Sequence, residues 1–370
     1  MHRWMVGGVV LFLWSTVTHS ADMEPKGAIT PETYICYRTS GPIEVDGKLD
    51  ETSWEDAPWT AYFVDIEGEL KPQPRFKTRA KMLWDEEYFY VAAQMEEPEV
   101  WAKLTQRDTV IFYDNDFEVF IDPDGDTHQY YEFEMNALNT GWDLFLVKPY
   151  RDGGPAVVAW DIAGLRTAVD VQGTLNQPGD VDREWSVELA FPWRVLKECA
   201  HRPTPPKDGD QWRVNFSRVE YYVDVVDGGY HKRKDPETQR DLPCDNWVWS
   251  PQGLINMHYP EMWGYVQFSI VEVGTSAVSF MPRPEEEAKR LLRKVYYRER
   301  MYYKEHYAYT NDVYRLGLGD LNSEHYTWPP VLQITDSLFE AWVEEKEDIG
   351  NDGRIDRWHI RQDSKIWRDP

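Results

Sequence analysis

Short strand-like segments separated by turn residues fill residues 30 to about 270, and this pattern limits the fold more than any other feature of the chain. Apolar and polar side chains alternate along these segments, as they do in strands with one buried face. Regular strands with Gly, Pro and Asp between them favour an antiparallel sandwich over alternating strand–helix–strand units. We therefore predict a mainly β fold, an antiparallel β-sandwich of the immunoglobulin-like or jelly-roll type, over residues 30–272. The clearest strands are expected at Phe76–Trp84, Tyr88–Met95, Phe117–Asp122, Tyr130–Asn136, Asp143–Lys148, Leu165–Val171, Trp185–Phe191, Gln211–Val219 and Trp263–Ile270.

The character of the sequence changes after Val273. Acidic residues at 285–287 suit the first turn of a helix, and apolar residues recur at near-helical spacing as far as His306. Between Arg283 and His306 there are eight Lys or Arg and five Glu, so this helix carries 8 − 5 = +3. Such a helix can lie on a membrane or a partner, or dock on an acidic domain. We predict a mostly helical, α-rich extension over residues 283–370, of unknown role, with a hairpin at Trp358–Trp367.

The N-terminus has the pattern of an export signal. Arg3 precedes an apolar run from about Val6 to Val17, and small and polar residues follow up to Ala21. The run is shorter than the roughly 20 residues that cross a bilayer. We expect a cleaved signal peptide at residues 1–21, a secreted or periplasmic protein and no membrane span in the mature chain; an uncleaved signal anchor is the alternative.

Composition narrows the classes of partner. The formal net charge of −25 argues against nucleic acid, because phosphates attract the opposite sign. The 18 Trp residues exceed what most cores use, and indole faces pack well on neutral sugars. Cys36, Cys199 and Cys244 lack CxxC spacing, so no zinc or redox motif is indicated. Two of them can pair in an oxidising compartment, or all three can be buried thiols. The oligomeric state is not indicated.

An acidic turn lies inside the predicted hairpin Asn115–Asn136. Asp122, Asp124 and Asp126 are crowded around one proline and one glycine. Three neighbouring carboxylates repel one another unless water or a hard cation intervenes, and Ca²⁺ prefers such oxygen ligands. A solvated hairpin turn is the equally simple alternative.

Four segments in order resemble carbohydrate-binding module family 9 and its wider family 9-like group of exported proteins. Together they cover about 240 residues and stop before the C-terminal hundred. They are Ile43–Trp54 (IEVDGKLDETSW), Leu83–Val91 (LWDEEYFYV), Asn115–Leu144, and Val187–Trp193 (VELAFPW) joined to Trp249–Gly253 (WSPQG) and Trp263–Phe268 (WGYVQF).

This resemblance implies a sandwich that grips a sugar between two aromatic rings, which fall on Phe112 and Trp249. The flanking polar contacts of the family fall on Glu118 and Asn246. Where the xylanase-associated sugar-binding modules have an arginine on the second hairpin strand, this chain has Glu134. A donor-only guanidinium is thereby replaced by a carboxylate that accepts. The family also holds structural Ca²⁺, for which Asp122, Asp124 and Asp126 are the candidates here.

The expected function is therefore carbohydrate binding, as an exported accessory protein in polysaccharide catabolism without catalytic residues. A hydrolase acting on O-glycosyl bonds is one alternative, since Glu118 and Glu134 lie on adjacent strands and such enzymes need two carboxylates roughly 5–10 Å apart. A haem b redox domain is another, because Met257, His258 and Met82 offer axial atoms. The absence of CxxCH excludes c-type attachment.

Overall fold

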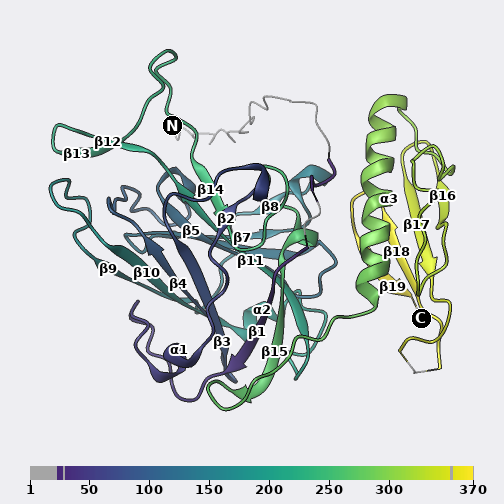
Figure 1. The fold of residues 1–370 in the computed structure, drawn as a ribbon, viewed down its shortest axis with the longest axis horizontal. Coiled ribbons are helices and arrows are strands. Elements are labelled where there is room, and N and C mark those ends of the chain that lie inside the picture. The colour runs from purple at the N-terminus through teal and green to yellow at the C-terminus, as the bar shows by residue number, and fades with distance from the viewer. Residues whose placement is uncertain (1–22, 28–29, 351–352, 370) are drawn as a thin grey trace, which may run out of the picture.

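The chain forms a large β-sandwich and a smaller C-terminal unit of one helix and a four-stranded sheet (Figure 1). The computed structural model describes residues 23–27, 30–350 and 353–369. The predicted signal peptide lies outside the described residues. Within them, no helix has the length and apolarity that a membrane crossing requires.

One continuous sheet of 13 strands builds the sandwich. Its strands are β1 (Thr33–Arg38), β2 (Val64–Asp65), β3 (Thr78–Trp84), β4 (Tyr88–Glu96), β5 (Asp116–Asp122), β6 (Tyr130–Asn136), β7 (Gly141–Leu146), β8 (Ala156–Val157), β9 (Arg166–Gln172), β10 (Glu184–Pro192), β11 (Gln211–Glu220), β14 (Asp245–Val248) and β15 (Gly264–Glu272). They run in the order β8-β7-β6-β5-β11-β15-β1-β3-β4-β10-β9, with β14 on β11 and β2 on β14. Short helices α1 (Thr52–Asp56) and α2 (Trp193–Leu196) and a hairpin of β12 (Val223–Val226) and β13 (Gly229–Lys232) connect them.

The sheet folds over so that its two ends enclose one core. Apolar residues that alternate along β4 and β10 meet those of β5, β6 and β11 in a single cluster, which includes Met95, Val187, Val119, Phe133 and Phe216. The alternation of apolar and polar residues in the sequence therefore correctly predicted which side chains face the core. Every predicted strand is present, with slightly shifted ends. The mainly β prediction is confirmed.

Strand β1 differs from the antiparallel prediction. It runs parallel to both of its neighbours, β15 and β3, so the sheet is mixed. Parallel neighbours need a long connection, and β1 and β15 come from opposite ends of the sandwich sequence. The immunoglobulin-like or jelly-roll detail stays a prediction. All three cysteines are free, and Cys36 and Cys199 are buried.

The C-terminal unit is less helical than predicted. Helix α3 (Glu285–His306) begins where the acidic turn predicts. Beyond it the α-rich prediction is wrong, because the chain forms four strands there, of which only β17 has buried residues at every second position. These are β16 (Val331–Ile334), β17 (Phe339–Glu344), β18 (Arg357–Arg361) and β19 (Ile366–Asp369). The predicted hairpin is present as β18–β19. Tyr259 of the sandwich belongs to the same apolar cluster as α3 and β17, so the two units share packing.

Candidate functional site

A patch of carboxyl groups lies on the outward face of the β5–β6 hairpin. The register places Glu118 opposite Glu134. Successive residues of a strand point to opposite faces, so Asp116, Glu118, Glu132 and Glu134 share the outward face while the residues between them enter the core. We call these four residues the acidic face.

Neighbouring strands extend this face with polar and aromatic groups. Trp142 on β7 lies opposite Glu134, and Ser217 on β11 lies opposite Glu118. Trp142 is half-buried, and its Nε1 has no hydrogen-bond partner among the described residues. A buried indole N–H normally has a partner. Trp142 therefore places a partly exposed ring, with a buried and unpaired N–H, in the same row as Glu134.

Three carboxyl groups of the acidic face converge. One oxygen each from Asp116, Glu118 and Glu134 lies within 4.8 Å of the others. These residues are buried, with 0%, 6% and 1% of their surface exposed. The backbone N–H of Phe112 donates to Glu134 Oε2 at 3.2 Å. The N–H of Val219 donates to Asp116 Oδ1 at 3.3 Å, while Asp116 Oδ2 has no partner among the described residues.

Burial raises the pKa of every member of the acidic face. For Glu118 the pKa rises to about 7, although a hydrogen bond from the Ser217 hydroxyl lowers it in part. Burial also holds the pKa of Asp116, Glu132 and Glu134 well above the usual range, and repulsion from neighbouring carboxylates adds to the rise. An unpaired buried carboxylate is costly. At neutral pH these groups therefore need protons or a nearby positive charge.

Four of the five predicted sugar contacts meet at this face. Phe112 reaches Glu134 through its backbone, and its ring packs against Tyr113 at 5.1 Å. In the strand register, Asn246 on β14 lies opposite Val219 on β11, and Val219 lies opposite Asp116 on β5. Asn246 is therefore in the same cross-strand row as Asp116, and Glu118 is in the next row on this face.

Trp249 is the exception, and its expected role as a sugar-stacking ring is corrected. The residue is 2% exposed and lies in the core, where its ring packs against Tyr34 and Phe216 at 6.4 and 5.8 Å between centroids. Asn246 and Trp249 are three positions apart, and strand alternation sends them to opposite faces of the sheet. The indole therefore cannot act with Asn246 on one ligand in this arrangement.

The two alternative functions find little support in this geometry. Glu118 and Glu134 do face each other, as expected, but their ligand oxygens lie within 4.8 Å and both residues are buried. This spacing is shorter than the roughly 5–10 Å that separates the two carboxyl groups of glycosidases. For haem, Met82 is in the sandwich core, whereas the His258 ring packs on Phe120 and Tyr130 on the outward face. Met257 packs on the same cluster as Phe120 and Tyr130, so the sheet separates Met82 from both Met257 and His258.

The predicted calcium turn keeps its three carboxylates together. Asp122, Asp124 and Asp126 each place one oxygen within 4.8 Å of the others. Both oxygens of Asp122 accept backbone N–H groups, from Gly125 and Thr127 at 3.0 Å. The Lys365 ammonium lies 3.2 Å from Asp126. The donor set suits Ca²⁺, but backbone groups and a lysine already satisfy part of it.

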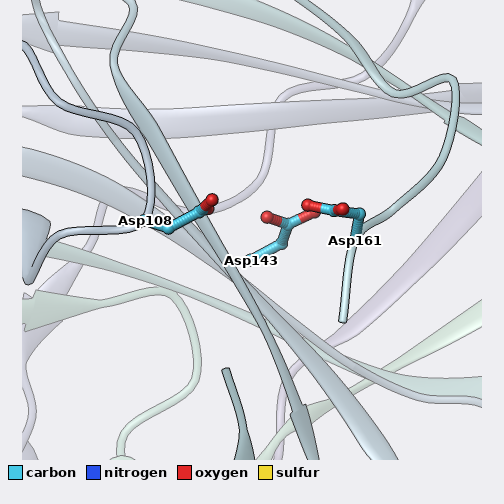
Figure 2. A group of neighbouring side chains, drawn as sticks. All are labelled: Asp108, Asp143 and Asp161. Atoms are coloured by element: carbon cyan, nitrogen blue, oxygen red, sulfur yellow. The ribbon is translucent and has the colours of Figure 1, made fainter. Parts of the chain in front are cut away.

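A third acidic group was not predicted from the sequence. Figure 2 shows Asp108, Asp143 and Asp161 pointing toward one another. The Arg107 guanidinium lies among them, 2.5 Å from Asp143, 3.5 Å from Asp161 and 3.6 Å from Asp108. An arginine therefore supplies the positive charge that this group needs.

A shallow pocket of about 320 Å³ lies elsewhere, on the outward side of β4 and β10. It is lined by Trp59, Gln94 and Glu184 among others. The Arg79 guanidinium lies 4.0 Å from the Trp59 ring centroid and the Lys81 ammonium 4.3 Å from it, so this indole already holds two cations. Gln94 and Glu184 hydrogen-bond each other at 2.9 Å. This pocket is the second place where an aromatic ring and polar groups meet.

Three members of the site were not predicted: Trp142, Asp116 and Glu132. A usable signal was present in the sequence. Once Glu118 and Glu134 are assigned to one face, alternation adds Asp116 and Glu132. The short turn between the second and third strands then places Trp142 beside Glu134.

Comparison with known proteins supports the resemblance seen in the sequence. Residues 45–169 match the model of the family described as carbohydrate family 9 binding domain-like. No curated protein matches the chain significantly. A proposed carbohydrate-binding protein from Bacteroides uniformis is 15% identical, with a TM-score of 0.47, and the match covers 65% of this chain and 100% of that one.

A family 9 carbohydrate-binding module from Caldicellulosiruptor kristjanssonii, solved with cellotriose, is 14% identical with a TM-score of 0.39, covering 67% of this chain and all of the module. The same module has been solved with glucose. TM-scores below 0.5 are too low to transfer a fold or a ligand. The family match confirms the expected resemblance: over residues 45–169 this chain is similar to the carbohydrate family 9 binding domain-like family.

Proposed function

We propose that this chain is a carbohydrate-binding protein whose sandwich takes sugar on the outward face of β5, β6 and β7. The single observation that carries the proposal is the position of Trp142, a half-buried ring in the same cross-strand row as Glu134 and Glu118, with Glu134 between the other two. A few fixed polar groups beside an aromatic ring are what a sugar site needs. The family match over residues 45–169 includes all three residues.

In this proposal Trp142 replaces Trp249 as the main stacking ring, and Phe112 lies beside the carboxyl groups. Glu118, Glu134 and Asn246 bond sugar hydroxyls. The carboxyls accept hydrogen bonds when ionised and also donate when protonated, so their raised pKa values suit hydroxyl groups, which do both. An exported, accessory role in polysaccharide catabolism follows from the family resemblance and the N-terminal pattern.

A glycan array followed by calorimetry with xylo- and gluco-oligosaccharides tests the proposal. We expect saturable binding by the wild-type chain and at least tenfold weaker binding by Trp142→Ala, equivalent to about 1.4 kcal/mol. Trp142→Phe keeps a ring and is expected to lose less.

Trp59→Ala is the matched control, because it removes the half-buried indole of the other pocket. The proposal fails if the wild type binds no glycan, or if Trp59→Ala abolishes binding while Trp142→Ala leaves it intact. Release of reducing sugar without added hydrolase would favour the glycosidase alternative instead. Circular dichroism melting of each variant separates lost binding from lost folding.

We further propose a structural Ca²⁺ at the Asp122, Asp124 and Asp126 turn. Burial, followed by repulsion from its neighbours, holds the pKa of Asp122 well above the usual range and raises that of Asp124 to about 7. A cation would relieve that repulsion and brace the turn. Calcium should therefore raise the melting temperature of the wild type by more than it raises that of Asp124→Asn. Equal shifts in both would show that no ion binds at this turn.

A further inference from the structure

We propose that Asp116, Glu118 and Glu134 form a binding site for a hard divalent cation such as Ca²⁺ or Mg²⁺, separate from the Asp122 turn. The proposal goes beyond sugar binding and is tested without sugar, although Glu118 and Glu134 are also among the proposed sugar contacts. It rests on a comparison of the three acidic groups of the described chain, each of which brings three carboxylates within 4.8 Å.

Two of the three groups have their own positive charge. Arg107 lies among Asp108, Asp143 and Asp161, and reaches Asp143 at 2.5 Å. Lys365 lies 3.2 Å from Asp126. Both groups are therefore at least partly neutralised by the protein itself.

Asp116, Glu118 and Glu134 have no such partner. Among the described residues, no lysine, arginine or histidine makes an ion pair with any of the three. Arg218, a buried arginine on β11, points to the other face of the sheet, because its position alternates with that of Ser217. It pairs with Glu97 and Glu220 at 2.9 Å instead. This group is also the only one in the described chain whose three members are all buried.

Unpartnered buried oxygens point to a ligand at the same place. Asp116 is fully buried, and its Oδ2 has no hydrogen-bond partner in the described chain. Glu132 is 5% exposed and lies on the same face two residues before Glu134, and its Oε2 is also unpartnered. Buried polar atoms are nearly always satisfied, and buried charges are paired or coordinate metals.

The donor set determines the kind of ion. All candidate ligands are carboxylate oxygens, which suit Ca²⁺, Mg²⁺ or Mn²⁺ rather than softer metals. The strands β5 and β6 hold the three side chains rigidly by their register. In the resembling modules an arginine is expected where this chain has Glu134, so a bound cation would restore positive charge at that position.

Calorimetry with CaCl₂ and, separately, MgCl₂ on the chelator-treated chain tests the site without any sugar. We expect the wild type to bind at least one of the two ions at this site. Glu134→Gln and Asp116→Asn should each weaken that binding at least tenfold and leave any ion at the Asp122 turn in place. Both substitutions keep side-chain volume and remove buried negative charge, and so they should preserve the fold; melting curves of the metal-free variants check this.

Two control variants locate the ion. Asp161→Asn changes the arginine-neutralised group and should bind as the wild type does. Asp124→Asn removes any ion at the turn, and should retain the binding that Glu134→Gln abolishes. The inference is overturned if the wild type binds neither ion at millimolar concentration, or if Glu134→Gln and Asp116→Asn bind as tightly as the wild type. These titrations contain no sugar, so their outcome is read separately from that of the glycan measurements, although Glu118 and Glu134 belong to both proposals.

Discussion

At the scale of single residues, Gly47 explains why the opening motif of the sandwich has the sequence Val-Asp-Gly. Its φ is +92°, and a Cβ added there would lie 2.5 Å from the backbone nitrogen of Asp170. Glu188 holds the same turn: it accepts hydrogen bonds from Gly47 N–H and from the Trp54 indole, both at 2.7 Å. The motif therefore packs the N-terminal turn against β9, through Gly47, and hydrogen-bonds it to β10, through Glu188.

Gly47→Ala should destabilise the chain by about 1–3 kcal/mol, because alanine is strained at positive φ and its methyl group meets backbone. Gly41→Ala is the matched control, since a Cβ there meets no atom within 4 Å. Its effect should stay within about 0.5 kcal/mol. Urea unfolding of both variants measures the difference, and equal losses would show that the close approach is unimportant.

The parts of the site that could be predicted from the sequence are those that follow from the alternation of side chains along a strand. This alternation assigns Glu118 and Glu134 correctly, because both lie inside regular strands with strictly alternating neighbours. It also excludes Trp249 once Asn246 is assigned to the outward face, since an odd separation along a strand reverses the face. The convergence of Asp116 with Glu134 was not predictable, because it depends on how the two strands pair in register.

At the scale of elements, Glu286 fastens helix α3 to the sandwich. Its carboxylate lies 2.7 Å from the Lys289 ammonium and 3.1 Å from the Arg213 guanidinium on β11, and Tyr265 on β15 donates to it. Burial alone would raise the pKa of Glu286, but Lys289 and Arg213 outweigh it and lower the pKa to about 2. The folded chain therefore favours the ionised form.

The sign of the pH effect follows from that lowered pKa. The stabilisation by Glu286 is present above its unfolded pKa of about 4.5 and is lost as the pH falls toward about 2. Glu286→Gln should cost about 1–3 kcal/mol at pH 7, and this difference from the wild type should shrink between pH 4.5 and 2. Urea unfolding at several pH values measures it.

Glu305→Gln is the control for the same helix, because the Glu305 side chain is 76% exposed. It should change stability by less than about 0.5 kcal/mol at every pH. A Glu286→Gln variant as stable as the wild type at pH 7, or a difference that does not depend on pH, would contradict the proposed fastening.

Elements with a long regular pattern were predictable, whereas the short and non-local ones were not. The strands from β3 to β11, apart from the two-residue β8, and helix α3 each carry a clear period. The strands β16 and β17 are short and follow a helix, so their alternation was too brief to override an α-rich prediction. The parallel pairing of β1 involves partners far away in the sequence, and no local pattern reports it.

At the scale of the whole molecule, the acidic turn joins the two units. The β18–β19 hairpin lies against it: Lys365 pairs with Asp126, the Ile366 N–H donates to the Asp126 carbonyl at 3.3 Å, and the Thr127 hydroxyl donates to the Ser364 carbonyl at 3.0 Å. The turn for which the sequence predicts a calcium site thus also contacts the C-terminal unit. Within the part of the chain that the structure describes, no lysine forms an ion pair with the acidic face on β5 and β6.

A crystal structure of the chain saturated with the xylo- or gluco-oligosaccharide that binds best by calorimetry tests the proposed function most directly. We expect a sugar ring in van der Waals contact with Trp142, with hydroxyl groups within hydrogen-bond distance of Glu118, Glu134 or Asn246. A sugar bound instead in the Trp59 pocket or on the C-terminal sheet, with the Trp142 face free, would contradict the assignment.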